Sequence, residues 1–291
     1  MSDRTPLPTA RRLWARYEPL HAVTYFSPEA RAAWEGAGVR GYWRGYFAGR
    51  TAPLGPVEAA PVTALFFGFA PAMVARALPD IWTRVSPQRA LQVRVEGAVA
   101  ALRRLLPADA PVAAAADALQ RAVDGADLAG RALGAANAAV AAPADDLGRL
   151  WHAATVLREH RGDGHVAALV AAGLDGCESL VWRAALDLRR EDLQPNRGWT
   201  DEEWAAARAR LAERGWLAAT GEPTDEGRRR FREVEAATDR AAGRAWRHLD
   251  AGGADGAQDV ERLLGPLAAA AARALPASNP IGLPGLAGPA R

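Results

Sequence analysis

The sequence predicts a mainly α-helical protein, and three observations support this prediction. Apolar residues recur at helical spacing, as they do at Leu13, Trp14, Tyr17 and Leu20. Alternating Val, Ile and Thr residues between turn residues, which would indicate strands, are nearly absent. Alanine, the residue with the highest intrinsic helix propensity, is abundant. We therefore expect a fold built almost entirely from helices.

The first half of the chain carries local signals for helix starts. Residues 9–26 predict a helix that Pro19 breaks or kinks. Ser27 and Ser86 predict N-caps, because each precedes a proline, and proline is favoured at the first position of a helix. Between these caps, residues 40–82 are first aromatic and glycine-rich and then apolar, with several interrupting prolines. We expect an apolar helical region in that part of the chain.

The second half predicts further helices and two breaks. Residues 107–143 are mostly Ala with Asp and Arg, a composition that suits helices or a loosely packed spacer. Asp145 or Asp146 is expected to cap a new helix. Residues 160–165, H-R-G-D-G-H, predict a turn, since two glycines permit positive φ, and an apolar helix follows them. Residues 191–198, EDLQPNRG, predict a loop.

These signals divide the chain into four segments. Residues 1–106 form a predicted N-terminal helical domain, and residues 107–144 an Ala-rich connecting segment. Residues 145–265 form a second predicted domain. Residues 266–291 are Ala-rich and then Gly- and Pro-rich, which predicts a flexible tail.

The composition excludes several classes of function. All 36 basic residues are arginine, which rules out a lysine Schiff base, a P-loop lysine and a lysine general base. The one cysteine, Cys177, can form neither an internal disulfide nor a cysteine-based zinc site, and we expect it to be a buried thiol. The sequence shows no apolar signal segment and no convincing membrane span. We expect a soluble cytoplasmic protein that does not bind membranes.

The segment Gly198–Arg240 resembles the second half of a winged helix-turn-helix domain of the MarR type. The resemblance rests on "RLAERGWL" (Arg210–Leu217) and on "PTDEGRRRF" (Pro223–Phe231), where Thr224 would cap the next helix. It extends over residues 145–242. The whole chain also resembles a group of bacterial helix-turn-helix proteins that share the "HAVTYFSPEAR" and "REHRGDGH" stretches. This resemblance implies a C-terminal winged helix with a short wing, preceded by an N-terminal domain that is itself winged-helix-like in one interpretation.

The resemblance implies DNA binding, but the charges of the motif depart from the family pattern. A recognition helix contacts base edges and phosphates, whereas three carboxylates, which repel phosphate, stand at the start of this one: Asp201, Glu202 and Glu203. The short wing after Leu217 has no basic residue. The DNA-contacting candidates are Arg228, Arg229 and Arg230, for which a solvated helix face is the alternative interpretation.

The H-R-G-D-G-H segment is the first candidate site. His160, His165 and Asp163 could perform acid–base catalysis if the protein is an enzyme, and Arg161 could hold an anionic ligand. His21, brought from the other domain, could complete a metal or haem site with the two histidines. In the alternative interpretation Asp163 caps a helix, Arg161 pairs with an acid, and the histidines are buried hydrogen-bonding groups.

A second candidate site lies in the N-terminal domain. His21 and Tyr25, four residues apart, share one face of a helix. An aromatic and basic group could line a pocket for a flat or anionic ligand: Tyr42, Trp43, Arg44 and Tyr46. The alternative is a core helix with structural aromatic residues.

Two functions therefore stand side by side. The first is a ligand-binding winged-helix regulator of transcription, with DNA and a small molecule as partners and a homodimer suggested by analogy with the fold. The second is an enzyme or ligand-binding protein on a winged-helix scaffold that has lost DNA binding. No motif identifies a cofactor.

Overall fold

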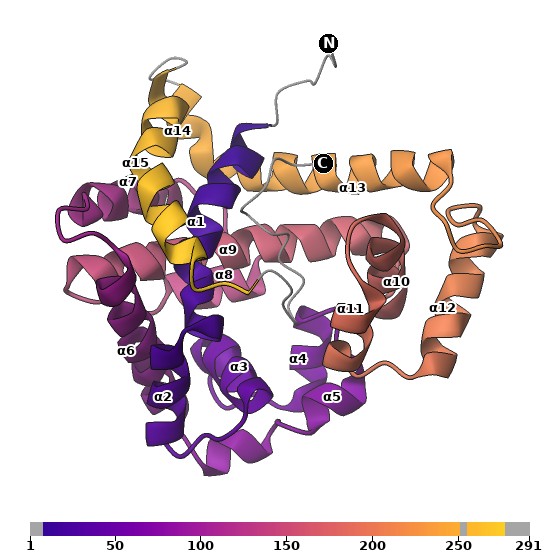
Figure 1. Cartoon of the computed structure of the whole chain (residues 1–291), viewed down its shortest axis with the longest axis horizontal. Coiled ribbons are helices and arrows are strands. Elements are labelled where there is room, and N and C mark those ends of the chain that lie inside the picture. Colours follow the sequence, from indigo (N-terminus) through magenta and orange to yellow (C-terminus); the bar gives the residue numbers. More distant parts are fainter. Residues whose placement is uncertain (1–7, 251–254, 277–291) are drawn as a thin grey trace.

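The computed structural model describes residues 8–250 and 255–276, and within these ranges the protein is mainly helical, as predicted. Figure 1 shows the helices arranged around one long central helix, α9. The strand-like pairing in these ranges is a single antiparallel bridge between Leu217 and Pro223. No helix in the same ranges is both long and apolar enough to cross a membrane.

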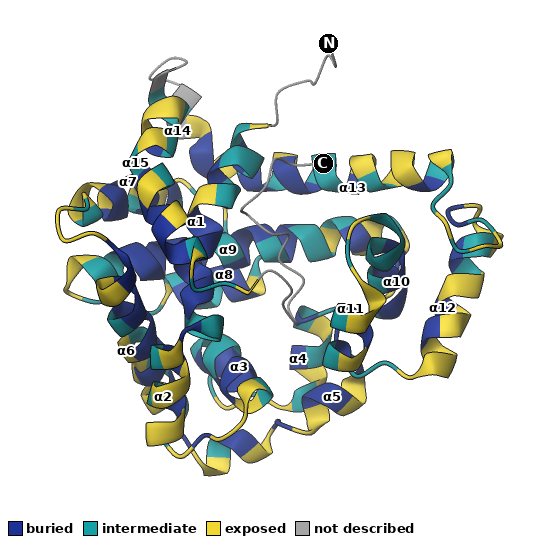
Figure 2. Cartoon of the chain, in the orientation of Figure 1, coloured by how far each residue is buried: buried dark blue, intermediate teal, exposed yellow. Residues whose placement is uncertain are grey.

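Helix α9 (Asp146–Ala171) runs through the middle of the molecule. Its 26 residues span about 39 Å at the usual rise of an α-helix. Asp145 caps it, as predicted, by accepting a hydrogen bond from the backbone N–H of Gly148. Five helices pack along α9: α1, α6, α7, α8 and α13. Figure 2 shows most of α9 buried, so this helix links the separate parts of the core.

The first hydrophobic core lies around the first half of α9. Leu13, Leu20 and Trp151 are fully buried in it, and α1 continues through Pro19 without ending. The helices that form this core with α9 are α1 (Thr9–Phe26), α6 (Pro87–Leu105), α7 (Val112–Asp124) and α15 (Asp255–Ala272).

The second hydrophobic core is N-terminal and rich in aromatic side chains. It contains Phe47, Phe66 and Phe69, whose rings are in mutual contact. The predicted caps are confirmed, since Ser27 accepts from the N–H of Ala30 and Ser86 from that of Arg89. Its helices are α2 (Pro28–Gly36), α3 (Tyr42–Thr51), α4 (Ala59–Leu65), α5 (Pro71–Ala75) and the start of α6.

The third hydrophobic core is C-terminal and is centred on tryptophan. The ring centroids of Trp182 and Trp216 lie 4.9 Å apart in a tilted arrangement, and Trp204 packs into the same cluster. Thr224 caps α13 by accepting from the N–H of Gly227, as predicted. The helices of this C-terminal lobe are α10 (Gly176–Leu186), α11 (Arg190–Arg197), α12 (Asp201–Glu213) and the first half of α13 (Asp225–Gly243), and α14 (Arg247–Asp250) follows them.

The predicted turn at H-R-G-D-G-H is wrong, because residues 160–165 lie inside α9. Of its two glycines, Gly164 serves close packing instead of a change of direction. A Cβ at Gly164 would lie 1.9 Å from the guanidinium of Arg131, and that of Gly134 would lie 3.0 Å from His160 Cα. Helix α8 (Ala132–Ala138) therefore crosses α9 closely at this point.

Other differences from the expected elements also result from tertiary packing. The predicted loop 191–198 is helix α11 up to Arg197, because Leu193 is buried in the C-terminal core and holds that short helix in place. The segment 107–144, for which the sequence predicts helices or a loose spacer, contains the helices α7 and α8, and both pack against α9. The predicted tail begins inside α15, where Leu267 is buried, and residues 277–291 lie outside the described residues.

Candidate functional site

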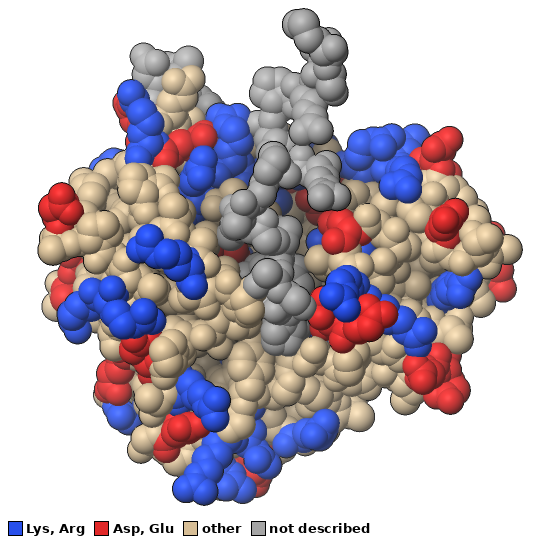
Figure 3. Space-filling view, in the orientation of Figure 1, with Lys and Arg blue, Asp and Glu red and all other residues tan. Residues whose placement is uncertain are grey.

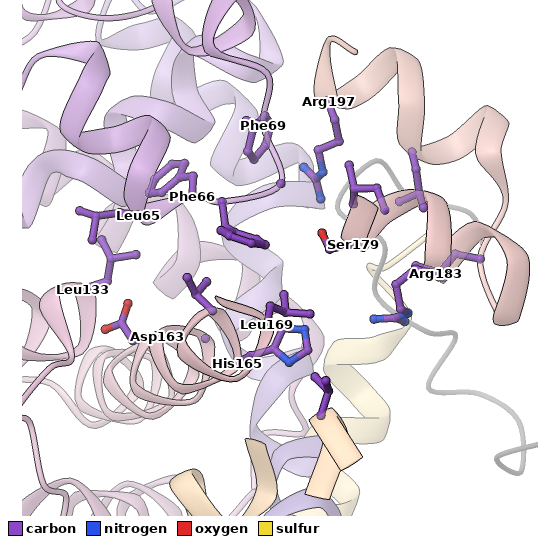
Figure 4. A pocket seen from close by; sticks show the side chains of 18 of the residues that line it. Leu65, Phe66, Phe69, Leu133, Asp163, His165, Leu169, Ser179, Arg183 and Arg197 are labelled. Carbon is purple, nitrogen blue, oxygen red and sulfur yellow. The ribbon is translucent and has the colours of Figure 1, made fainter. Parts of the chain in front are cut away.

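The four polar side chains of H-R-G-D-G-H point to four different partners. His160 Nε2 contacts the carbonyl oxygen of Asp127 at 3.1 Å, and His165 Nδ1 contacts Thr238 Oγ1 at 3.0 Å. The other two side chains also have partners within the protein. Arg161 pairs with Asp239 at 2.9 Å, and the Asp163 carboxylate accepts a hydrogen bond from the N–H of Gly134 at 2.8 Å. Figure 4 shows Asp163 and His165 on different sides of the helix. The four side chains do not meet at one point.

Burial controls the protonation of two of these groups. It raises the pKa of the Asp163 carboxyl to about 6, against the opposing effect of the Gly134 hydrogen bond. It lowers the pKa of His165 to about 3, and the charges of Arg183 and Arg161 lower it further. His165 is therefore neutral at pH 7. Thr238 donates its own hydroxyl hydrogen to Val234, so the Nδ1 of His165 is the donor in their contact.

The described residues contain no group of three His, Cys, Asp or Glu side chains that could hold a metal ion. His21, which the sequence placed beside His160 and His165, instead bridges Thr155 and Tyr25, at 2.9 Å from each. Cys177 is buried, and burial raises the pKa of its thiol to about 12. It is an inert core residue, as expected.

A network of buried charges lies beside His21 and Tyr25. Arg50 binds both carboxylate oxygens of Glu159, at 2.9 and 2.7 Å. Arg158 contacts Glu159 at 2.9 Å and Glu18 at 3.5 Å. Burial raises the pKa of Glu159, but Arg158 and Arg50 outweigh that effect and hold it below its usual range. The arginines and carboxylates of this central network satisfy one another.

The predicted N-terminal aromatic group is divided between the core and the surface. Tyr46 is buried and Trp43 packs on Phe69, whereas Tyr42 is partly exposed and Arg44 is exposed. A groove of about 600 Å³ runs between α1, α2 and α3 along three tyrosine and tryptophan side chains: Tyr25, Tyr42 and Trp34.

A cavity of about 220 Å³ lies between the N-terminal core and the C-terminal lobe, which contains α10, α11, α12 and the first half of α13. Its walls come from α9, from residues 65–69 and from α10, α11 and α13, so every large element near the lobe boundary contributes. Figure 4 shows Phe66 and Phe69 on one side and Ser179 and Arg183 on another. Of the sequence-predicted residues, three line this cavity: Tyr46, Asp163 and His165.

The segment between α4 and α5 connects the N-terminal core with the C-terminal lobe beside this cavity. Phe67 has φ +35°, a conformation that is strained for an aromatic residue. Its carbonyl oxygen would lie 2.0 Å from a Cβ at Gly176, so only glycine permits this approach to the start of α10. Trp199 Nε1 also donates to the carbonyl of Gly68 at 3.0 Å. The strained segment is therefore held by contacts to α10 and to the chain after α11.

Helices α11 and α12 are joined by a tight turn at Gly198. This residue has φ +80°, and a Cβ there would lie 2.6 Å from Met73 Cβ. Thr200 begins α12 with a capping box in which Glu203 takes part. Trp204 faces the core, and the opposite face of α12 is exposed at the edge of the molecule (Figure 2). Beyond α12, the Leu217–Pro223 bridge closes a short hairpin.

Two of the three carboxylates at the start of α12 are already engaged. Asp201 pairs with Arg190 at 2.5 Å, and the Glu203 carboxylate accepts from the backbone N–H of Thr200. Arg229 and Arg230 pair with glutamates of their own helix, whereas no contact of the exposed Arg228 with another charged side chain is found in the described residues.

Residues 10–277 match the family described as "Helix-turn-helix family". The match covers most of the chain, from α1 through α15. No curated protein and no solved structure is significantly similar to it.

Proposed function

Because the chain belongs to the helix-turn-helix family, we propose that it is a DNA-binding regulator whose lobe-boundary cavity binds a small molecule. Helices α11 and α12 are the DNA-facing pair in this proposal, and α12 is the recognition helix. The cavity is the sensor, since α11 forms part of its wall.

The position of the cavity is the observation that carries the proposal. Arg197, the last residue of α11, lines it, and the turn at Gly198 leads directly into α12. The backbone N–H of Ala70 donates to the carbonyl of Arg197 at 2.9 Å, so the segment between α4 and α5 also contacts this turn. A molecule bound there contacts both lobes and one end of the helix pair, which gives it a physical route to the DNA-facing surface.

The charge of the α12 surface fits a limited contact with phosphate. Asp201 and Glu203 are engaged within the protein, which leaves Glu202 as the carboxylate of this group without such a contact in the described residues. Arg228, near the start of α13, is exposed and has no charged partner among the described residues, so we propose it as the phosphate contact. On the face shown in Figure 3, basic and acidic side chains are interspersed. We therefore expect DNA sequence recognition to depend on specific contacts with bases and not on net positive charge alone.

The MarR-type identity is part of this proposal. The hairpin closed by Leu217 and Pro223 lies where a MarR-type wing would follow its recognition helix, and it is short. A homodimer is also proposed, because two-fold symmetric regulators bind paired half-sites on DNA. Light scattering on the purified protein measures that state directly.

Retention of genomic DNA tests the proposal. Purified protein is mixed with sheared DNA from its source genome at about 0.15 M salt, and the retained fragments are sequenced. We expect a reproducibly enriched sequence, bound with an affinity that falls as salt rises. Absence of any enriched sequence contradicts DNA-specific regulation.

Two variants locate the contact. Arg228→Ala is expected to weaken binding to all sequences and to reduce the salt slope by about 1, as loss of one phosphate contact does. Arg31→Ala removes the same charge from α2, where Arg31 pairs with Glu35, and is expected to leave binding unchanged. Equal effects of the two variants would contradict the assignment of this surface.

A further inference from the structure

The guanidinium of Arg197 is buried without a counter-ion. The residue is only 7% exposed, and its Nη1 has no hydrogen-bond partner. The described residues provide no carboxylate that pairs with it, and its Cζ lies 4.3 Å from the centre of the Phe69 ring. Because arginine stays protonated in proteins, a full positive charge is left at this wall of the cavity. Figure 4 shows the side chain reaching from α11 toward Phe69 and Ser179.

A second unsatisfied donor lines the same cavity. Trp182 is 1% exposed, and its indole N–H has no partner. A buried donor without a partner costs about 1–3 kcal/mol, and more when it is charged. Two unsatisfied donors on residues that line one cavity, one of them cationic, indicate a ligand that brings hydrogen-bond acceptors and negative charge.

The other arginines that line the cavity are already paired. Arg50 and Arg158 bind Glu159, and Arg183 binds Asp187 at 2.7 Å. Asp163 also lines the cavity, but its carboxylate is held by the N–H of Gly134, and Figure 4 shows it near Leu133, away from Arg197. Arg197 is therefore the cavity cation left for a ligand among the described residues.

Much of the remaining wall is apolar, and the cavity volume limits the size of the ligand. Phe66, Phe69 and Phe231 line it together with leucines. The volume of about 220 Å³ is below the range of about 300–1,000 Å³ that is usual for drug-sized ligands. A nucleotide or a sugar phosphate, which is larger and polar throughout, does not match such walls.

We propose that this cavity binds a small organic acid, with its carboxylate on Arg197 and its apolar body against Phe66, Phe69 and Phe231. The proposal names the ligand class of the sensor in the proposed function and rests on it for its biological meaning, but binding can be measured without DNA. Arg197 acts as the anion anchor. The indole N–H of Trp182, a residue that lines the same cavity, is a second unsatisfied donor.

Calorimetric titration with two acids and their neutral amides tests the proposal. The probes are hexanoate and benzoate, which differ in the shape of the apolar body, against hexanamide and benzamide. We expect at least one acid to bind the full-length protein, and its amide to bind at least about tenfold more weakly, because a charge-assisted hydrogen bond is lost. Amides that bind as tightly as the acids would overturn the proposal, and so would the absence of binding by both acids at millimolar concentration.

Three variants assign the binding to Arg197. Arg197→Met is expected to reduce acid binding at least about tenfold, and Arg197→Lys, which keeps the charge, to retain part of it. Arg189→Met removes the same charge at the other end of α11, where the side chain is 69% exposed, and is expected to bind like the wild type. Wild-type affinity in Arg197→Met overturns the assignment.

The result can be separated from a failure of the proposed function. Tight binding of the amides would contradict the assignment of an acid as the ligand, but it would not contradict the assignment of the cavity as the sensor site. Binding of an acid without any retained DNA sequence would support the acid-binding site and contradict the proposed function as a DNA-binding regulator.

Discussion

Two neighbouring regions of this molecule enclose arginine side chains and differ in how the positive charge is balanced. In the central network, Arg50 and Arg158 share Glu159, which is itself 1% exposed. In the cavity, Arg197 is buried and meets the ring of Phe69 in place of a carboxylate. The two regions are adjacent, since Arg50 and Arg158 also border the cavity.

The comparison indicates which buried charges serve the fold and which serve a ligand. A buried ion pair whose partners come from the same chain is complete on folding, and breaking it leaves an uncompensated charge. Arg94, which is also buried without a carboxylate partner among the described residues, donates its Nη1 to the Gly49 carbonyl and to Asn137 Oδ1. The Nη1 of Arg197 has no such acceptor in the described part of the chain, so in our proposal another molecule completes it. The central network is therefore structural, whereas Arg197 is a binding residue.

The largest expected effect is on the central network. Glu159→Gln removes the shared partner of Arg50 and Arg158, and we expect the free energy of unfolding to fall by about 3–5 kcal/mol. Urea denaturation measures this loss. Glu29→Gln breaks the more exposed pair with Arg104 and is expected to cost less than about 1 kcal/mol. Similar losses in both variants would contradict the structural role of the network.

A smaller effect is expected where the two lobes meet. Gly176→Ala places a methyl group 2.0 Å from the carbonyl oxygen of Phe67, so the strained segment must move, at a cost of about 1–3 kcal/mol in stability. Gly36→Ala is the control, because no atom lies within 4 Å of the added Cβ. Thermal unfolding compares the two. An unfolding temperature of Gly176→Ala equal to that of the wild type would show that the contact between Phe67 and Gly176 does not stabilise the protein.

The pH dependence of stability tests the burial of His165. Its pKa is lowered to about 3 in the folded state, so below pH 6.5 the unfolded chain binds this proton more tightly, and stability falls as the pH falls. Between pH 7 and pH 5 the wild type should lose about 1–2 kcal/mol more than His165→Gln, as urea denaturation at each pH would show. Equal losses in both proteins would mean that His165 titrates normally. Asp163, whose pKa is raised to about 6, acts in the opposite direction and is present in both proteins.

The smallest expected effect on stability is at Arg197. Arg197→Met removes a charge that has no partner in the fold, so we expect the free energy of unfolding to stay within about 1 kcal/mol of the wild type. The same urea denaturation measures it beside Glu159→Gln. If Arg197→Met lowered the free energy of unfolding as much as Glu159→Gln does, Arg197 would serve the fold, and the two regions would not differ in role.

The helical fold was predictable because its signals are local. Ser27, Ser86 and Thr224 each cap a helix whose first turn lies in the next few residues, so sequence alone identifies them. The helix through H-R-G-D-G-H was not predictable in this way. Gly164 is needed because Arg131, distant in the sequence, packs against it, and α8 approaches His160 through its own Gly134.

The cavity could not be predicted from the sequence for a related reason. Arg197 is one of many arginines, and only the folded chain shows that no carboxylate reaches it. The residues around it come from α4, α9, α10 and α13, and no spacing connects them. The sequence did place Tyr46, Asp163 and His165 at candidate sites, and they line the cavity, but Asp163 and His165 are held by Gly134 and Thr238.

The most direct test of the account is whether an acid at Arg197 alters DNA binding. The affinity for the retained DNA sequence is measured at about 0.15 M salt, with and without a saturating organic acid, for the wild type and for Arg197→Met. The account predicts a change of at least about fivefold in the wild type, the lower limit of typical allosteric coupling, and no change in Arg197→Met. An unchanged affinity in wild-type protein that has bound the acid would contradict it.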